Sequence, residues 1–148
     1  KKHDVIGVKV YDKMDMQLPD IGLVEIELEG GQKLYFASTH LDHLNDQNRL
    51  EQAKELINFL KPYQEHPIIM GGDFNMVPTN PVWNSIENFF DKGCSTCPGT
   101  FPAKGATTTI DYLLLNGAAS ETFKITGYYS VQENYASDHL PVVMKLEY

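Results

Sequence analysis

The chain has 148 residues, of which 42% are hydrophobic and 22% are charged, and its formal net charge at pH 7 is -8. This length supports one domain with a real core, and the composition excludes a disordered chain. The negative charge disfavours tight, sequence-independent nucleic-acid binding, which depends on basic surface, although bound cations can offset it locally. No apolar run is long enough to span a membrane.

The first part of the chain predicts three strands. Val5 to Tyr11 is rich in β-forming residues. In the next segment apolar and acidic residues alternate, as Val24, Glu25, Ile26, Glu27 and Leu28. This alternation predicts a half-buried strand with the glutamates on a solvent face. Gly30-Gly31 then predicts a hairpin turn into a strand over Lys33 to Leu41.

The middle of the chain predicts two helices around a buried strand. Apolar residues recur at helical spacing from about Asp46 to Tyr63, and Pro62 helps to end that helix. Pro67 to Met70 predicts a short, fully apolar strand before Gly71-Gly72. Thr79 can cap a second helix running to about Phe90.

A loop from Asp91 to Thr108 precedes the last predicted strands. These strands cover Ile110 to Leu115, Phe123 to Val131 and Val142 to Leu146. Because helices alternate with strands only in the middle of the chain, the pattern predicts a mixed α/β sandwich with at least one sheet covered by helices.

The chain has two cysteines, in Cys94-Ser95-Thr96-Cys97. C-x-x-C can be a redox motif or half of a zinc site, but the sequence has no second pair of ligands nearby. Lys92-Gly93 before the motif and Pro98-Gly99 after it indicate a loop. This context favours an incidental loop pair or a local disulfide over a redox centre.

Polar residues gather where predicted strands begin or end. The stretches are Thr39-His40-Leu41-Asp42-His43, Asp73-Phe74-Asn75, Ile110-Asp111-Tyr112 and Ser137-Asp138-His139-Leu140-Pro141. The structural alternatives are a satisfied core histidine at His40, an Asx-turn at Asp73 and Asn75, a hydrogen-bonded buried acid at Asp111 and a turn cap at Asp138. Together the four stretches can converge on one edge of a sandwich. There they would supply oxygen ligands for Mg²⁺ and imidazoles for a phosphate.

The same stretches carry a family resemblance. T-H-L-D-H, G-D-F-N, I-D-Y and S-D-H-x-P, in this order, resemble the endonuclease/exonuclease/phosphatase superfamily. The predicted helix that bears Asn48-Arg49-Leu50-x-x-Ala53 also resembles the family's stretch after its T-H motif. The resemblance covers nearly the whole chain, from about Val5 to Tyr148.

The resemblance implies a fold of the α/β (α+β) class. The superfamily fold is a four-layer αββα sandwich of two similar halves. Residues 1–148 resemble its C-terminal half, as a single domain with a mixed sheet and about two main helices. The family's first half supplies an Asn and a metal-binding Glu, and this chain begins after both.

Two departures from the family pattern bear on the expected site. Glu25, Glu27 and Glu29 do not replace the family's Glu, because their alternation places them on a solvent face. Thr109 stands where many relatives carry Arg, so one cationic phosphate contact has no counterpart. The chain opens at Lys1-Lys2-His3 without an initiator Met, so the sequence carries no information on localisation.

By resemblance, the activity is phosphoester hydrolysis by in-line attack of water. Asp73 orients or deprotonates that water, Asn75 hydrogen-bonds a phosphate oxygen, and His139 stabilises the developing negative charge. Asp111 fixes the tautomer of His139 and keeps it protonated, and His40 contacts the same phosphate as donor or general acid. The expected metal ligands are Asp138, Asp73 and Asn75, which would hold Mg²⁺ or Mn²⁺ weakly without the family's Glu.

Two functions compete. The first is a metal-dependent phosphohydrolase, with this chain inactive in isolation, and the alternative is a non-catalytic binding or scaffolding module derived from the same fold. Competent residues at every matched position favour the enzyme. The substrate stays open among nucleic acid, phosphoinositide and other phosphodiesters, and Phe101 either stacks on a base or lipid head group or packs under its loop. An uncovered sandwich face predicts self-association.

Overall fold

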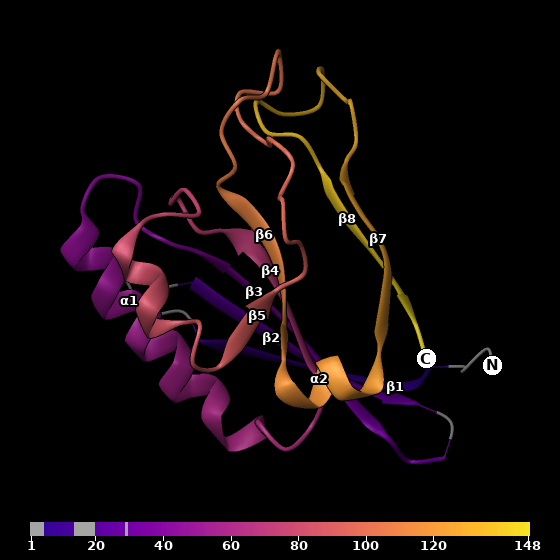
Figure 1. Ribbon diagram of the computed structural model, residues 1–148. Coiled ribbons are helices and arrows are strands. Elements are labelled where there is room, and N and C mark those ends of the chain that lie inside the picture. Colours follow the sequence, from indigo (N-terminus) through magenta and orange to yellow (C-terminus); the bar gives the residue numbers. More distant parts are fainter. Residues whose placement is uncertain (1–4, 14–19, 29) are drawn as a thin grey trace.

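The computed structural model describes residues 5–13, 20–28 and 30–148. They form a six-stranded sheet and a separate two-stranded sheet, with the long helix Asp46–Leu60 on one side of the larger sheet (Figure 1). The strands are β1 (Val5–Lys13), β2 (Asp20–Leu28), β3 (Lys33–His40), β4 (Ile68–Asp73), β5 (Phe90–Lys92), β6 (Asp111–Asn116), β7 (Lys124–Ser130) and β8 (Val142–Glu147). The helices are α1 (Asp46–Leu60) and α2 (Gly117–Thr122), with 3-10 turns η1 (Lys61–Tyr63) and η2 (Pro81–Ser85).

The larger sheet is mixed, with the strand order β1-β2-β3-β4-β6-β5. Strands β3 and β4 are parallel, and their connection passes through α1. The other neighbouring pairs in this sheet are antiparallel. The mixed sheet and the sandwich expected from the sequence are therefore confirmed.

Helix α1 forms where helical spacing predicts it and covers one face of the large sheet. The side chain of Asn45 caps it by accepting hydrogen bonds from the amides of Gln47 and Asn48. Ala53, Leu56 and Leu60 are buried in the core against the sheet. Beyond Leu60 the chain tightens into η1, which has a proline in its first turn.

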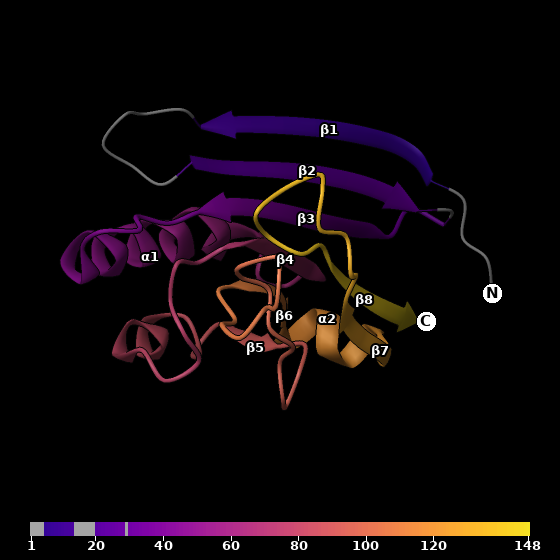
Figure 2. The same cartoon turned by 90° about the horizontal axis from the view of Figure 1, so that it is seen from above.

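The second sheet, β7 and β8, lies over the opposite face of the large sheet, at its β6 end (Figure 2). The hydroxyl of Tyr128 on β7 accepts a hydrogen bond from the amide of Leu113 on β6 at 2.9 Å. Met144 on β8 comes so close to Gly93 that a Cβ there would lie 2.6 Å from its Sδ. These contacts hold β7 and β8 against β6 and leave β1 and β2 at the far edge (Figure 2).

The second helix expected from Thr79 to about Phe90 is wrong. The segment forms only η2, capped by the side chain of Asn80, and Phe90 already belongs to β5. The residues whose spacing imitated a helix are buried core residues: Val82, Ile86 and Phe90. A 3-10 turn followed by a strand buries these three side chains as well as a helix would. Residue spacing therefore does not distinguish the two structures, and tertiary packing decides which one forms.

The expected solvent face of β2 is also wrong at Glu25. Its side chain is only 6% exposed, because Glu25 shares the helix-covered face with Leu23. Tyr35 donates its hydroxyl hydrogen to Glu25 at 2.9 Å, and Lys33 pairs with it at 3.2 Å. Glu27 is exposed as expected, and Glu29 lies outside the described residues. A buried carboxylate is tolerated here because it is paired and hydrogen-bonded.

Cys94 and Cys97 form a local disulfide in the loop after β5. This agrees with the loop pair that the sequence favours over a redox or zinc motif. In the described part of the chain, no helix is long and apolar enough to cross a membrane.

Candidate active site

Three of the expected site residues form a row across neighbouring strands at one edge of the large sheet. His40 ends β3 and lies opposite Asp73 at the end of β4, and Asp73 lies opposite Asp111 at the start of β6. The ends of the parallel strands β3 and β4 meet at this edge, and antiparallel β6 begins there. Strand order and register therefore bring together residues far apart in the sequence.

The glycines before Asp73 are part of β4 and do not form a turn. The strand extends to Asp73, three residues beyond the predicted end at Met70. A Cβ on Gly72 would lie 2.1 Å from the carbonyl oxygen of Thr39 on β3. Only glycine lets the two strands approach this closely, so Gly72 sets how Asp73 lies relative to β3.

Asp73 and Asn75 form the local turn that the sequence left as an alternative. Asp73 Oδ1 accepts a hydrogen bond from the amide of Asn75 at 2.8 Å. Asn75 has a φ of 51°, a left-handed conformation that Asn tolerates better than most residues. Its Nδ2 donates to the carbonyl of Leu41 at 2.9 Å, which ties the end of β4 to the end of β3. The turn leaves Asp73 Oδ2 directed toward His40, at 3.6 Å from Nε2.

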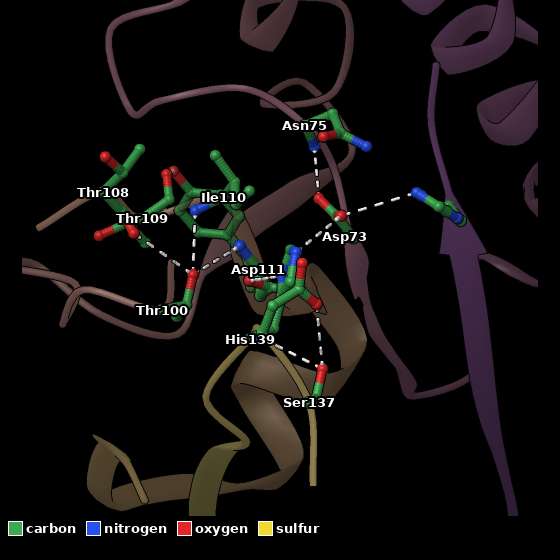
Figure 3. A network of polar contacts seen from close by, with 12 residues as sticks. Asp73, Asn75, Thr100, Thr108, Thr109, Ile110, Asp111, Ser137 and His139 are labelled. Carbon is green, nitrogen blue, oxygen red and sulfur yellow. Dashed lines mark hydrogen bonds and ion pairs between the residues drawn. The ribbon is translucent and has the colours of Figure 1, made fainter. Parts of the chain in front are cut away.

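His139 reaches this row from the loop between β7 and β8. Its Nδ1 lies 2.9 Å from Asp111 Oδ2 and 3.1 Å from Asp111 Oδ1 (Figure 3). Because an ionised carboxylate only accepts hydrogen bonds, Nδ1 carries the proton in this pair. The other ring nitrogen, Nε2, lies 4.0 Å from Asp73 Oδ2. The Asp111–His139 pair expected by resemblance is therefore formed.

Burial and neighbouring charges shift two pKa values at the site. The pKa of Asp73 lies above its ordinary value of 3.8, mainly because burial disfavours the charged carboxylate, with repulsion from Asp111 as a further cause. The Asn75 hydrogen bond and the two imidazoles oppose this rise. Burial lowers the pKa of His139, but the hydrogen bond and charge of Asp111 outweigh it and leave this pKa raised.

A pocket of about 350 Å³ opens beside this cluster, between β6 and the segment that leads into β8. Asp73, Asp111 and His139 line its polar end, and Leu113, Leu140 and Val142 are among its apolar residues. The lining therefore has a polar end and an apolar end.

Asp73, Asp111 and His139 each offer a ligand atom, and these atoms lie within 4.8 Å of one another. Two carboxylates that repel each other at a desolvated edge suit a divalent cation, which prefers oxygen ligands. Nδ1 of His139 is engaged with Asp111, so the carboxylates are the better candidate ligands. Asp138, the expected ligand, is exposed and lies outside this group, with its Oδ1 3.5 Å from Ser137 Oγ.

Some supporting residues were not expected from the sequence. Ser137 Oγ accepts a hydrogen bond from the amide of His139 at 3.1 Å. The ring of Phe101 packs against the His139 imidazole, with the centroids 4.9 Å apart. The two interpretations of Phe101 drawn from the sequence, a stacking platform and a loop-packing residue, both missed this contact. No local pattern could have placed Phe101, because it comes from a loop far from His139 in sequence.

The comparisons with known proteins identify the fold. At the sequence level, no protein-family model matches the chain and no curated protein is significantly similar to it. Solved structures do match. The mannosyl-6-phosphatase Bt3783 of Bacteroides thetaiotaomicron has a TM-score of 0.78 at 18% identity, over 99% of this chain and 68% of its own. An endonuclease/exonuclease/phosphatase family protein from the same organism has a TM-score of 0.74 at 18% identity, over 98% and 66%. This chain has the endonuclease/exonuclease/phosphatase fold.

The human Nocturnin catalytic domain, solved with a bound sulfate anion, extends the endonuclease/exonuclease/phosphatase comparison beyond bacteria. Its TM-score is 0.72 at 21% identity, over 98% of this chain and 60% of its own length. The chain spans about two thirds, or less, of these structures. At identities this low, the structural match establishes the fold alone. This match confirms the resemblance drawn from the four motifs.

Proposed function

We propose that this chain carries the active site of a metal-dependent phosphoester hydrolase that uses in-line attack by water. The observation that supports it best is the placement of Asp73 between His40 and His139, with Asp111 behind His139, at the mouth of a pocket. A carboxylate between two imidazoles is suited to orient or deprotonate a water. The imidazoles are suited to bind the phosphoryl oxygens that this water attacks.

Each residue has a role in this proposal that follows from its contacts. His139 donates from Nε2 to a phosphoryl oxygen in its imidazolium form, which the hydrogen bond from Nδ1 to Asp111 favours. His40 contacts the same phosphate from β3. Asn75 Nδ2 donates one hydrogen to Leu41 O and has a second hydrogen for a further phosphate oxygen. Catalysis then rests on positioning and on electrostatic stabilisation of the charge that develops on those oxygens.

The candidate cation site belongs to the same proposal. Asp73 and Asp111 would hold Mg²⁺ or Mn²⁺, with Asp138 and Asn75 as further candidate ligands. A bound cation would supply neutralisation of charge at the phosphoryl oxygens.

A small phosphoester is the substrate class that we propose, and the name of one structural neighbour and the charge of this chain support it. That neighbour is a mannosyl-6-phosphatase, a sugar-phosphate phosphatase by name. Arg49 is the chain's only arginine, and it is engaged by Asp46 and by the carbonyl of Asp42 on α1's side of the sheet. With this shortage of basic groups and a net charge of -8, a small phosphoester is a better substrate than a long polyanion.

The proposal is tested on the native gene product that carries this chain. We expect hydrolysis of p-nitrophenyl phosphate or bis(p-nitrophenyl) phosphate that requires Mg²⁺ or Mn²⁺ and stops in EDTA. In water enriched in oxygen-18, the heavy isotope should appear in the released phosphate and not in the alcohol, as attack on phosphorus requires.

A short oligonucleotide and a phosphoinositide serve as competing substrates in the same assay. Turnover that survives EDTA, or heavy oxygen in the alcohol, would contradict the proposed mechanism. Phosphate binding without any turnover would instead support the non-catalytic binding module.

A further inference from the structure

The loop between β5 and β6 contains a hairpin, residues 98–109, that contacts both members of the Asp111–His139 pair. Phe101 and Thr108 form its β-bridge, and Thr100 donates its amide hydrogen to Thr108 O at 2.8 Å. Thr100 is completely buried, with an exposed fraction of 0%. Hydroxyl groups are rarely buried this deeply unless they are hydrogen-bonded, so the contacts of this one are informative.

The side chain of Thr100 holds the start of β6. Its Oγ1 accepts hydrogen bonds from the amides of Ile110 at 3.2 Å and Asp111 at 3.3 Å (Figure 3). The hydroxyl hydrogen is directed to Thr108 O at 3.5 Å. Beside the pairing of β6 with β4, one hydroxyl group therefore fixes the two amides at which the strand begins, and the second of them belongs to Asp111.

The main chain around Thr100 holds the segment that carries His139. Leu140 donates its amide hydrogen to Thr100 O at 2.7 Å, and Ala103 donates to Asp138 O at 2.6 Å. These two bonds lie on either side of His139. Thr100 thus contacts the backbone of Asp111 and the backbone next to His139. The side chains of Asp111 and His139 meet at 2.9 Å.

We propose that Thr100 is a positioning residue that sets the Asp111–His139 hydrogen bond through its hydroxyl group. If Thr100 only filled space, Val would serve equally well at this site, because Val has the same shape and no hydroxyl. The proposal concerns the geometry of the pair, and its kinetic consequence rests on the proposed phosphoester hydrolysis.

The chain offers a matched control in the same hairpin. Thr109 is also buried, and its Oγ1 donates to Pro98 O at 2.8 Å without contacting Asp111. Thr100→Val and Thr109→Val each remove one buried hydroxyl, so both should lower thermal stability. Only Thr100→Val should disturb the pair. Thr100→Ser keeps the hydroxyl and should preserve the pair.

The first readout is proton NMR of the uncomplexed protein, which needs no substrate. An imidazole proton bonded to a carboxylate gives a downfield signal, which His139→Gln assigns by its disappearance. We expect Thr100→Val to lose or shift this signal, and Thr100→Ser and Thr109→Val to keep it. An unchanged signal in Thr100→Val, or no such signal in the native protein, would overturn the proposal.

The second readout is the kinetics of phosphoester hydrolysis. Thr100→Val should lower kcat by about 10-fold to 100-fold, the cost of a small misplacement of catalytic groups. KM should stay within about twofold, because the hydroxyl does not touch substrate. An equal loss of kcat in Thr109→Val would show that general destabilisation is the cause.

Two further outcomes keep the tests separate. If the native protein hydrolyses no phosphoester, the proposed function fails, while the NMR comparison still decides the role of Thr100. If Thr100→Val does not fold, the folded Thr100→Ser protein decides, because loss of the downfield signal there would contradict a role for the hydroxyl.

Discussion

At the scale of single residues, Asp73 is placed where its charge is useful and costly at once. Its carboxylate faces two imidazoles, yet burial and Asp111 raise its pKa. Active sites typically contain residues whose functional protonation state, here the ionised carboxylate, destabilises the fold. Replacing it should therefore separate activity from stability.

We expect Asp73→Asn to lower kcat of phosphoester hydrolysis by about 10²-fold to 10⁴-fold, the usual cost of losing a general base. The Asn side chain can still accept the hydrogen bond from the amide of Asn75, so the turn should persist. Asp91→Asn, at an exposed position on β5, is the control and should keep native kinetics. Native turnover in the Asp73 variant would refute its catalytic role.

The same variant predicts a pH dependence of stability. Because the folded-state pKa of Asp73 is raised, the folded protein binds this proton more tightly than the unfolded chain does. The native protein therefore loses stability as the pH rises from about 3.8 through the folded-state pKa. Asn does not titrate, so the variant should gain stability relative to the native protein between pH 4 and pH 7.5, as measured by urea unfolding in EDTA. A relative loss over this interval would show that the carboxylate is stabilised, not strained.

At the scale of elements, the close approach of β3 and β4 positions the row of site residues. Thr39 and Gly72 lie opposite each other in the parallel pair, one residue before His40 and Asp73. Any side chain on Gly72 would clash with the Thr39 carbonyl oxygen. This oxygen belongs to the backbone and cannot move aside as a flexible side chain can. The two strands would have to separate, and the distance between His40 and Asp73 would grow.

We expect Gly72→Ala to destabilise the fold by about 3 kcal/mol or more, at the upper end of overpacking effects. Gly22→Ala is the matched control, because a Cβ on this glycine of β2 meets nothing within 4 Å. The control should change stability by no more than about 0.5 kcal/mol. Chemical denaturation of both variants tests this, and equal losses would mean that the close approach does not matter.

At the scale of the whole molecule, the face of the large sheet opposite α1 is buried only in part. Other parts of the chain cover this face from β6 to β4, and the covering ends between β4 and β3. Leu115, Ile69 and Phe36 lie side by side on this face. Their exposed fractions rise from 1% through 8% to 38% along that row. The two-stranded sheet covers the β6 end, and on the same face of β2 and β3 the apolar side chains of Val24, Ile26, Leu34 and Phe36 remain partly exposed.

We propose that copies of this chain associate through this face. Phe36→Ser should weaken the association by about tenfold, equivalent to about 1.4 kcal/mol, which is within the value of one buried aromatic side chain. Leu44→Ser removes a more exposed apolar residue from the loop before α1 and should have no effect. Light scattering over a concentration series measures both. A native chain that stays monomeric throughout would disprove the association.

The sequence by itself determined the local features of this protein. Alternation and helical spacing located β3, α1, β4, β6, β7 and β8 within a few residues, because periodicity depends only on nearby positions. The motifs at the strand ends also identified His40, Asp73, Asn75, Asp111 and His139 as candidates. Alternation and helical spacing gave wrong predictions where tertiary packing overrode the local pattern, as at Glu25 and in the segment from Thr79 to Phe90.

Only the tertiary structure decided which candidates meet. Asp73 opposes Asp111 because β6 pairs with β4, and His139 joins them from the loop between β7 and β8. Asp138, adjacent to His139 in the sequence, is left exposed outside the cluster. Strand order and register depend on contacts between residues distant in the chain, so no local pattern encodes them. Thr100 shows the same limit, because its importance comes from the two backbones that it joins.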